Sequence, residues 1–284
     1  MNCPIFLWRI YKYIVHLFTG RSEIERICYD AELKSLDRLK LIQISVNSSK
    51  QLHHIEKQMR SEFDPGDVAI KIVEVKNFNQ ELLAFDSMIL PNLISALEPI
   101  SSFQGLKRSI ENKQKIPYDN SNLHHEASLE RLWDALLPDV RRSARLSKEW
   151  GTLGFQGMDP ATDFRGMGIL GLDNLIYLST KHSNEAREIL KNSNSKCCYP
   201  FAITGINITA LVLNLIDKPH FKIYFFKNGS TLDQFNELYS LVFISFDRFY
   251  QSKKPKSIME FNTIKKEFEI KISKDSDLVS LLRY

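Results

Sequence analysis

The chain has 284 residues, of which 43% are apolar and 11% aromatic, so it can fill the core of one large or two ordinary domains and is not a disordered chain. Its 38 basic and 34 acidic residues leave a net charge of +4, without the basic excess of a nucleic-acid-binding protein, so no nucleic-acid partner is expected. Cys3, Cys28, Cys197 and Cys198 fit neither a disulfide framework nor a zinc site, which favours a reducing, cytoplasmic compartment.

The segment IFLWRIYKYIVHLF (residues 5–18) predicts an amphipathic helix within residues 1–20. Arg9, Lys12 and His16 recur at helical spacing and share a narrow face that apolar side chains surround. About 14 residues are too few to span a bilayer, which takes about 20, and basic residues within the apolar stretch are unlike a secretory signal. The helix either packs on the domain core or lies in a membrane surface, which would make the protein peripheral on an organelle membrane.

Residues 21–115 are expected to form a helical N-terminal region. The apolar residues of segment 22–46 keep an approximate helical period, which predicts one long surface helix. VAIKIVEV (68–75) and FKIYFF (221–226) are β-branched or aromatic runs that favour short strands. Two such segments do not make a sheet protein, so the expected fold class is all-α with one or two short strand-like segments.

Residues 116–284 are expected to form the core domain. SNLHHEASLERLWDALLP (121–138) and TLDQFNELYSLVFISFDRFY (231–250) have apolar residues at three- and four-residue steps, which predicts two helices. Ser257 and Glu260 then have the spacing of a capping box and mark the start of a last helix.

TDFRGMGILG (162–171) allows two interpretations. Gly166, Gly168 and Gly171 satisfy G-x-G-x-x-G, but a dinucleotide-binding turn must follow a buried strand, and the preceding GFQGMDPATDFR has the composition of a loop. Asp-Phe-Arg-Gly is also close to the kinase Asp-Phe-Gly motif, but the chain contains no His-Arg-Asp catalytic loop, which excludes a kinase. The second interpretation is a loop that presents a single arginine, Arg165.

Residues 150–178 resemble the ELMO domain of ELMO domain-containing proteins. The family signature is Trp, three residues, Gly-Phe-Gln, three residues, Pro, one residue, Thr-Asp-Phe-Arg-Gly, and then glycine and leucines. Leu178 stands where an aromatic residue is usual, and it keeps an apolar contact. The resemblance extends loosely over residues 20–270 and implies an all-α, multi-helix domain. The matching residues are Trp150, Gly154, Phe155, Gln156, Pro160, Thr162, Asp163, Phe164, Arg165, Gly166, Gly168, Leu170, Leu172 and Leu175.

The resemblance implies a GTPase-activating protein for Arf and Arf-like small GTPases in the GTP-bound state, with Arg165 as an arginine finger supplied in trans. GTP and Mg²⁺ would be carried by the partner GTPase, so no cofactor, metal or substrate turnover of its own is expected. Family members of the other branch are scaffolds in Rac-activating complexes and lack this arginine. Arg165 therefore favours an activator, and a non-catalytic scaffold or effector that binds small GTPases is the alternative.

The chemistry of GTP hydrolysis agrees with this assignment, because a guanidinium can donate bidentately to the phosphate oxygens that gain negative charge. Gly166 and Gly168 are expected to let the backbone approach a partner closely. Asp163 is expected to hold Arg165 by a charge-assisted hydrogen bond, and Gln156 to orient the loop or touch the nucleotide pocket of the partner. The alternative is a structural arginine, satisfied by Asp163 or by helix carbonyls.

Trp150, Phe155 and Phe164 are expected to pack in the core or under the loop. Just before the motif lies a basic cluster with two possible roles. We expect it to be a solvated helix face, and the alternative is a surface that steers the domain to an acidic GTPase or an anionic membrane. Its members are Arg141, Arg142, Arg145 and Lys148.

Overall fold

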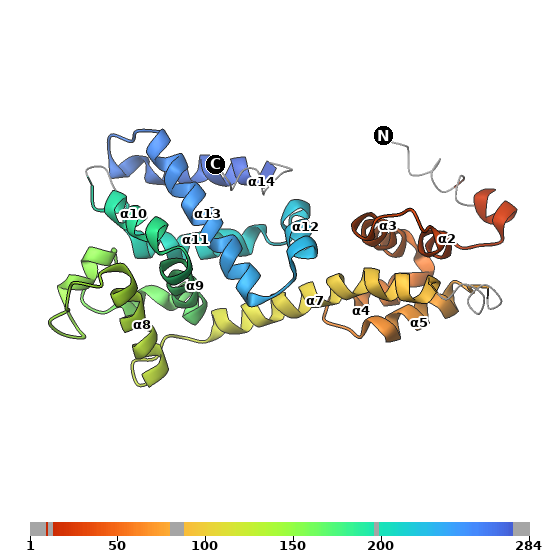
Figure 1. The fold of residues 1–284 in the computed structure, drawn as a ribbon, viewed down its shortest axis with the longest axis horizontal. Helices are drawn as coiled ribbons and strands as arrows, with labels where there is room; N and C mark the ends of the chain where they lie inside the picture. Colours follow the sequence, from red (N-terminus) through yellow and green to blue (C-terminus); the bar gives the residue numbers. More distant parts are fainter. Residues whose placement is uncertain (1–9, 11–13, 80–87, 196–198, 275–284) are drawn as a thin grey trace. The chain divides into compact units, whose positions relative to one another are not determined.

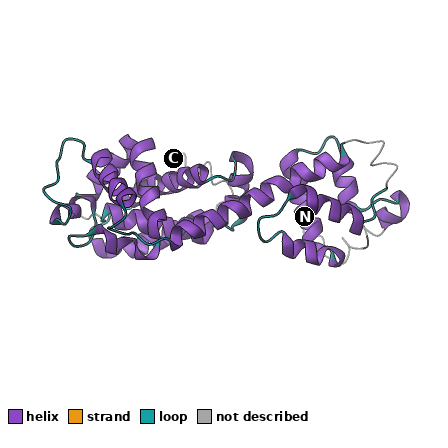
Figure 2. Ribbon diagram, turned by 90° about the horizontal axis from the view of Figure 1, so that it is seen from below, coloured by secondary structure: helices purple, strands orange, loops and turns teal. Residues whose placement is uncertain are grey.

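The computed structural model in Figure 1 describes residues 10, 14–79, 88–195 and 199–274. Every regular element within these ranges is an α- or 3₁₀-helix, with no strand among the described residues, as Figure 2 shows. The all-α class is therefore confirmed. The chain divides into two compact units, Met1–Gly105 and Leu106–Tyr284.

The first unit is built from short helices whose buried faces share one core. Ile24 of α2, Ile42 of α3 and Ile72 of α5 are fully buried in it. The elements are α2 (Glu23–Tyr29), α3 (Ser35–Ser48), η1 (Lys50–Leu52), α4 (His53–Gln58), α5 (Pro65–Val75) and the first part of α7 (Ile89–Lys115).

The prediction of one long helix over residues 22–46 is wrong, because the chain leaves the helix at Asp30 and starts a second one at Ser35. Arg38 of the second helix donates to the carbonyls of Ile27 (3.3 Å) and Asp30 (2.6 Å), which satisfies acceptors at the end of the first. Both helices bury apolar residues in the same core, so the apolar period continues across the break.

Both strand predictions are also wrong: residues 68–75 lie in α5, and residues 221–226 lie in α12 (Pro219–Asn228). Each helix has a proline in its first turn, and Asp64 caps α5 by accepting a hydrogen bond from the Asp67 N–H at 2.7 Å. A short apolar run fits a buried helix as well as a strand, so the signals at the start of the segment decide: a proline in both helices, and in α5 also the Asp64 cap.

In the second unit α9 (Gly168–Lys181) is the central helix. It contacts α8 (Leu123–Leu136), α10 (Ser183–Ser193), α11 (Phe201–Leu215) and α13 (Leu232–Ser252), as Figure 1 shows. Most of its side chains are buried, including all of its leucines. The helices predicted over residues 121–138 and 231–250 are confirmed as α8 and α13.

The last helix, α14 (Phe261–Lys274), follows a 3₁₀ turn, η4 (Ile258–Glu260). Ser257 caps this turn by accepting from the Met259 N–H at 3.2 Å, and the Glu260 carboxylate accepts from the Lys256 N–H at 2.9 Å. The predicted capping residues therefore both act as caps, but on the short turn that leads into the helix.

The segment predicted to be an amphipathic helix, residues 5–18, lies partly outside the described residues, as do Cys3, Cys197 and Cys198. Within it, residue 10 and residues 14–18 are helical, and this helix continues to residue 19. No single described helix is long and apolar enough to cross a bilayer, whereas α11 and α12, which are bent by 96° at their junction, meet the length and composition criteria only as a pair.

Candidate functional site

The first part of the motif forms a loop between α8 and α9 that contains two 3₁₀ helices, η2 (Lys148–Leu153) and η3 (Pro160–Gly166), and its last part, from Gly168 on, lies in α9. Trp150 anchors the start of the loop. Its ring is fully buried and meets Trp133 edge-on at 5.3 Å, and its Nε1–H donates to the Arg145 carbonyl at 2.8 Å. The base of the loop is therefore packed like the core of the domain.

Aromatic contacts continue under the loop from Trp150 to Tyr118. Phe155 lies edge-on to Trp150 at 5.8 Å and contacts Phe164 at 5.6 Å, and Phe164 stacks on Tyr118 at 5.5 Å. Phe164 is fully buried, so the residue directly before Arg165 is fixed on the inner side of η3. The aromatic residues of the motif pack under the loop in this structure.

Two glycines of the motif are required by the fold itself. Gly154 has φ +81°, and a Cβ atom there would lie 2.7 Å from the Pro200 carbonyl carbon. Gly168 has φ +54° and packs against backbone carbonyls at the end of α7. The expectation that Gly168 leaves room for a partner is thus wrong, because the protein itself fills that space, whereas Gly166 has nothing within 4 Å.

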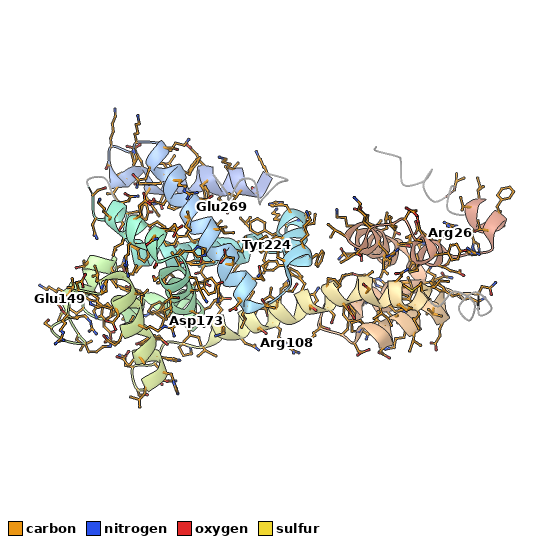
Figure 3. The ribbon with its side chains drawn as sticks, in the orientation of Figure 1. Arg26, Arg108, Glu149, Asp173, Tyr224 and Glu269 are labelled. Atoms are coloured by element: carbon orange, nitrogen blue, oxygen red, sulfur yellow. The ribbon has the colours of Figure 1, made fainter. Side chains whose placement is uncertain are left out.

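The end of α7 supports the end of the loop and the start of α9. Gln114 donates from Nε2 to the Gly166 carbonyl at 3.3 Å, and the Ile116 carbonyl accepts from the Ile169 N–H at 3.0 Å. Lys113 also pairs with Asp173 of α9 at 2.5 Å. Asp173 is labelled in Figure 3, as is Glu149 at the start of the motif, whose carboxylate accepts from Ser143 and Ser147.

The basic cluster before the motif is not a solvated helix face, because the segment between α8 and η2 has no α-helix and two of its arginines are engaged within the domain. Arg142 lies over the Trp150 ring at 4.1 Å and pairs with Glu130, which leaves its side chain 7% exposed. Arg141 and Lys148 are exposed.

Arg145 is the centre of a polar network. Its guanidinium pairs with Glu126 of α8, donates to Asp159 Oδ1 at 3.0 Å and donates to Asn120 Oδ1 at 3.2 Å. Burial acts to raise the pKa of Asp159, but hydrogen bonds from the Ala161 N–H and from Arg145 outweigh it and hold that pKa below its ordinary value. The charge of Arg145 is therefore compensated within the domain, where it stabilises the loop.

Sequence reasoning missed Asn120 and Glu126 because no spacing connects them with residues 145 and 159. A signal was nevertheless present. Glu126 and Glu130 are four residues apart on one face of a helix that Pro138 stops, and Arg142 and Arg145 follow this turn. Complementary charges on the two sides of a chain reversal indicate pairing.

Asp163 does not hold Arg165, contrary to our prediction. Its Oδ2 accepts from the Gln156 N–H at 2.7 Å. Burial raises the pKa of Asp163, and the hydrogen bond from Gln156 and the charge of Arg165 oppose that rise. Gln156 thus orients the loop through its backbone, and its side chain is exposed.

Arg165 is exposed, and within the described residues its guanidinium forms neither a hydrogen bond nor an ion pair. The structural-arginine alternative requires such a partner. Pro160 is buried at the start of η3, Thr162 is exposed, and its Oγ1 donates to the Asp159 carbonyl at 3.2 Å. The arrangement is a fixed base that projects the unpaired guanidinium of Arg165 into solvent. The described residues hold no group of three or more His, Cys, Asp or Glu that could bind a metal ion.

Residues 108–265 match the sequence model of the ELMO/CED-12 family. The chain is 90% identical over 283 residues to ELMO domain-containing protein B of Dictyostelium discoideum, with 100% of both chains covered. It is 38% identical to ELMO domain-containing protein 2 of Bos taurus, over 92% of this chain and 89% of that one. It is 33% identical to ELMO domain-containing protein 1 of Mus musculus, over 95% and 88%. The chain therefore belongs to the ELMO/CED-12 family, among the ELMO domain-containing proteins.

Proposed function

We propose that this protein is a GTPase-activating protein for Arf or Arf-like small GTPases and that Arg165 is its catalytic residue. The observation that carries the proposal is the exposed and unpaired guanidinium of Arg165 on a loop whose inner side is fixed by aromatic packing and hydrogen bonds. Family membership supports the regulation of small GTPases only in general terms, and the resemblance of the motif to that of the Arf activators supplies the class of partner.

The chemistry requires little else from this chain. The partner GTPase binds GTP and Mg²⁺, and Arg165 enters its nucleotide site to donate hydrogen bonds to the phosphate oxygens that gain charge. An arginine finger supplied in trans is worth about 10³ to 10⁵ in rate, or roughly 4 to 7 kcal/mol of barrier. A lysine lacks the planar fork and cannot replace it.

Single-turnover GTP hydrolysis by a panel of purified Arf and Arf-like proteins tests the proposal. We expect the wild-type chain to accelerate at least one of them, Arg165→Ala to abolish the acceleration while binding to the GTP-loaded partner is kept, and Arg165→Lys to rescue little. Arg131→Ala, which removes an exposed arginine of α8 outside the basic cluster, is the matched control and retains full activity.

Two outcomes would contradict the proposal. Full activity of Arg165→Ala would mean that the arginine is not catalytic. Tight GTP-dependent binding without acceleration by the wild-type chain would instead identify a scaffold or effector that binds small GTPases.

A second proposal, compatible with the first, is attachment of residues 5–18 to the cytoplasmic surface of an organelle membrane. The observation that favours it is the exposure of apolar side chains in the described part of this segment, with Leu17 64% and Phe18 87% exposed. In liposome flotation we expect the chain to float with anionic vesicles, and the variant Leu17→Ser/Phe18→Ser or a deletion of residues 1–20 to float less. If the chain without residues 1–20 floats as well as wild type, the membrane-attachment proposal is wrong.

A further inference from the structure

We infer that Arg145 is a positioning residue for Arg165, because its guanidinium holds the start of the 3₁₀ helix that carries the catalytic arginine. The inference rests on the proposed function, since the position of Arg165 matters only if it acts on a partner. Arg145 acts through a third residue, Asp159.

Asp159 ties the start of η3 to the rest of the domain, while the buried Phe164 and the hydrogen bond from Gln114 to the Gly166 carbonyl hold its end. Its Oδ1 accepts from the Ala161 N–H at 3.1 Å, and its carbonyl accepts from Thr162 Oγ1 at 3.2 Å, so it caps the helix with both its side chain and its backbone. A 3₁₀ helix of seven residues has few hydrogen bonds of its own. The geometry of its first turn therefore depends on how Asp159 is held, and a change there is transmitted along the short helix to Arg165.

Arg145 holds Asp159 while it binds two other segments. Nη1 donates to Asp159 Oδ1 at 3.0 Å, and Nη2 donates to Glu126 Oε1 at 2.9 Å and to Asn120 Oδ1 at 3.2 Å. Nε donates to the second oxygen of Glu126. A guanidinium presents these donors in fixed directions, which an ammonium cannot do. One side chain thus sets the angle between α8, the turn before it and the start of η3.

The charges of Glu126, Asp159 and Arg145 also indicate that Arg145 holds the start of η3. Glu126 is close enough to Asp159 to feel its charge, and the guanidinium of Arg145 between the two carboxylates compensates both. Without Arg145 the two carboxylates would repel each other, and the hydrogen bond that Asp159 accepts from Asn120 Nδ2 at 3.2 Å would have to oppose that repulsion, so the first turn of η3 would be held less firmly. The side chain of Arg145 is 26% exposed, and its donors are directed into the domain.

The test compares the full-length variants Arg145→Ala and Arg145→Lys with Arg131→Ala, which removes an exposed arginine of α8. Single-turnover hydrolysis by the GTP-loaded partner at increasing concentrations of this chain separates the maximal rate from the half-saturating concentration. We expect Arg145→Ala to lower the maximal rate about tenfold to hundredfold, since a displacement of about 1 Å can cost about 10²-fold. The half-saturating concentration changes less than about threefold. Arg145→Lys recovers part of the rate, and Arg131→Ala matches wild type.

Amide hydrogen exchange supplies a readout that needs no partner. We expect exchange within residues 160–166 to accelerate in Arg145→Ala while α9 stays protected. If this variant does not fold, Asp159→Asn replaces it, because asparagine keeps the capping oxygen but lacks the charge that Arg145 binds. The same change in rate and exchange is expected, with a smaller size.

Three results would overturn the inference. The first two are a maximal rate of Arg145→Ala within about twofold of wild type and unchanged amide exchange within residues 160–166. The third is a salt-sensitive rise in the half-saturating concentration at an unchanged maximal rate, which would mean that Arg145 steers the encounter with the partner. A wild-type chain that accelerates no GTPase would remove the proposed function, and the exchange experiment would still decide whether Arg145 holds the loop.

Discussion

The replacement of Gly154 by alanine is expected to destabilise the second unit far more than the replacement of Gly157. Both glycines lie in the Arg165 loop and have positive φ, +81° and +71°. Their surroundings differ, because a Cβ at Gly154 would lie 2.7 Å from the carbonyl carbon of Pro200 and nearer still to the Phe201 nitrogen, whereas a Cβ at Gly157 would meet nothing within 4 Å. The atoms that Gly154 would strike belong to the backbone at the start of α11 and cannot rotate away.

The magnitude follows from two contributions. A left-handed alanine costs about 1–2 kcal/mol, and the lower entropy of the unfolded chain returns about 0.4–1 kcal/mol, so Gly157→Ala should lose about 1 kcal/mol or less. Gly154→Ala adds backbone displacement, for which overpacking costs about 1–3 kcal/mol, so its total is about 2–4 kcal/mol. Thermal unfolding followed by circular dichroism should show midpoints lower by roughly 2–4 °C per kcal/mol. Equal shifts in the two variants would refute the reasoning.

Three further predictions concern stability. Tyr199→Phe removes the hydroxyl that donates to Asp247 at 2.5 Å, and since this carboxylate is 5% exposed, urea unfolding should show a loss of about 1–3 kcal/mol. Gly168→Ala should lower the thermal midpoint strongly, because its φ is +54° and backbone carbonyls fill the Cβ position; an unchanged midpoint would contradict this. Burial acts to raise the pKa of Glu126, but hydrogen bonds from Arg145 and a tyrosine hold it below the ordinary value of 4.5. The stability that comes from this lowered pKa is present above pH 4.5 and is lost as the pH falls below it. When the free energy of unfolding is measured at decreasing pH, Arg145→Ala should therefore lose less of it than the wild-type chain does.

Much of the fold could be predicted from periodicity alone. The helices over residues 121–138 and 231–250 are long and carry continuous apolar stripes, which only a helix accommodates. The segments at 68–75 and 221–226 could not be assigned in the same way, because a run of eight or fewer apolar residues fits either period. Their helical state depends on the preceding prolines and on Asp64, which are local signals that outweigh β propensity.

In the candidate site, too, some features could be predicted from the sequence and others could not. Arg165 could be located from its motif because the flanking residues are close in sequence. Its environment could not, since Asp163 is engaged by the backbone of Gln156, and the support for the loop comes from Gln114 and Glu126 on separate helices. Such contacts join distant segments through folding, and no spacing encodes them.

The absence of an Asp163–Arg165 bond in the part of the chain that the structure describes has a mechanistic consequence on the proposed function. An arginine already paired with a carboxylate would have to break a charge-assisted bond before it could bind a phosphate oxygen, and that cost would subtract from the acceleration. Asp163 accepts from a backbone N–H instead, so it fixes the loop without competing for the guanidinium. The same division of tasks extends to Arg145, which is paired and holds the structure, while Arg165 remains unpaired until the transition state supplies its partner.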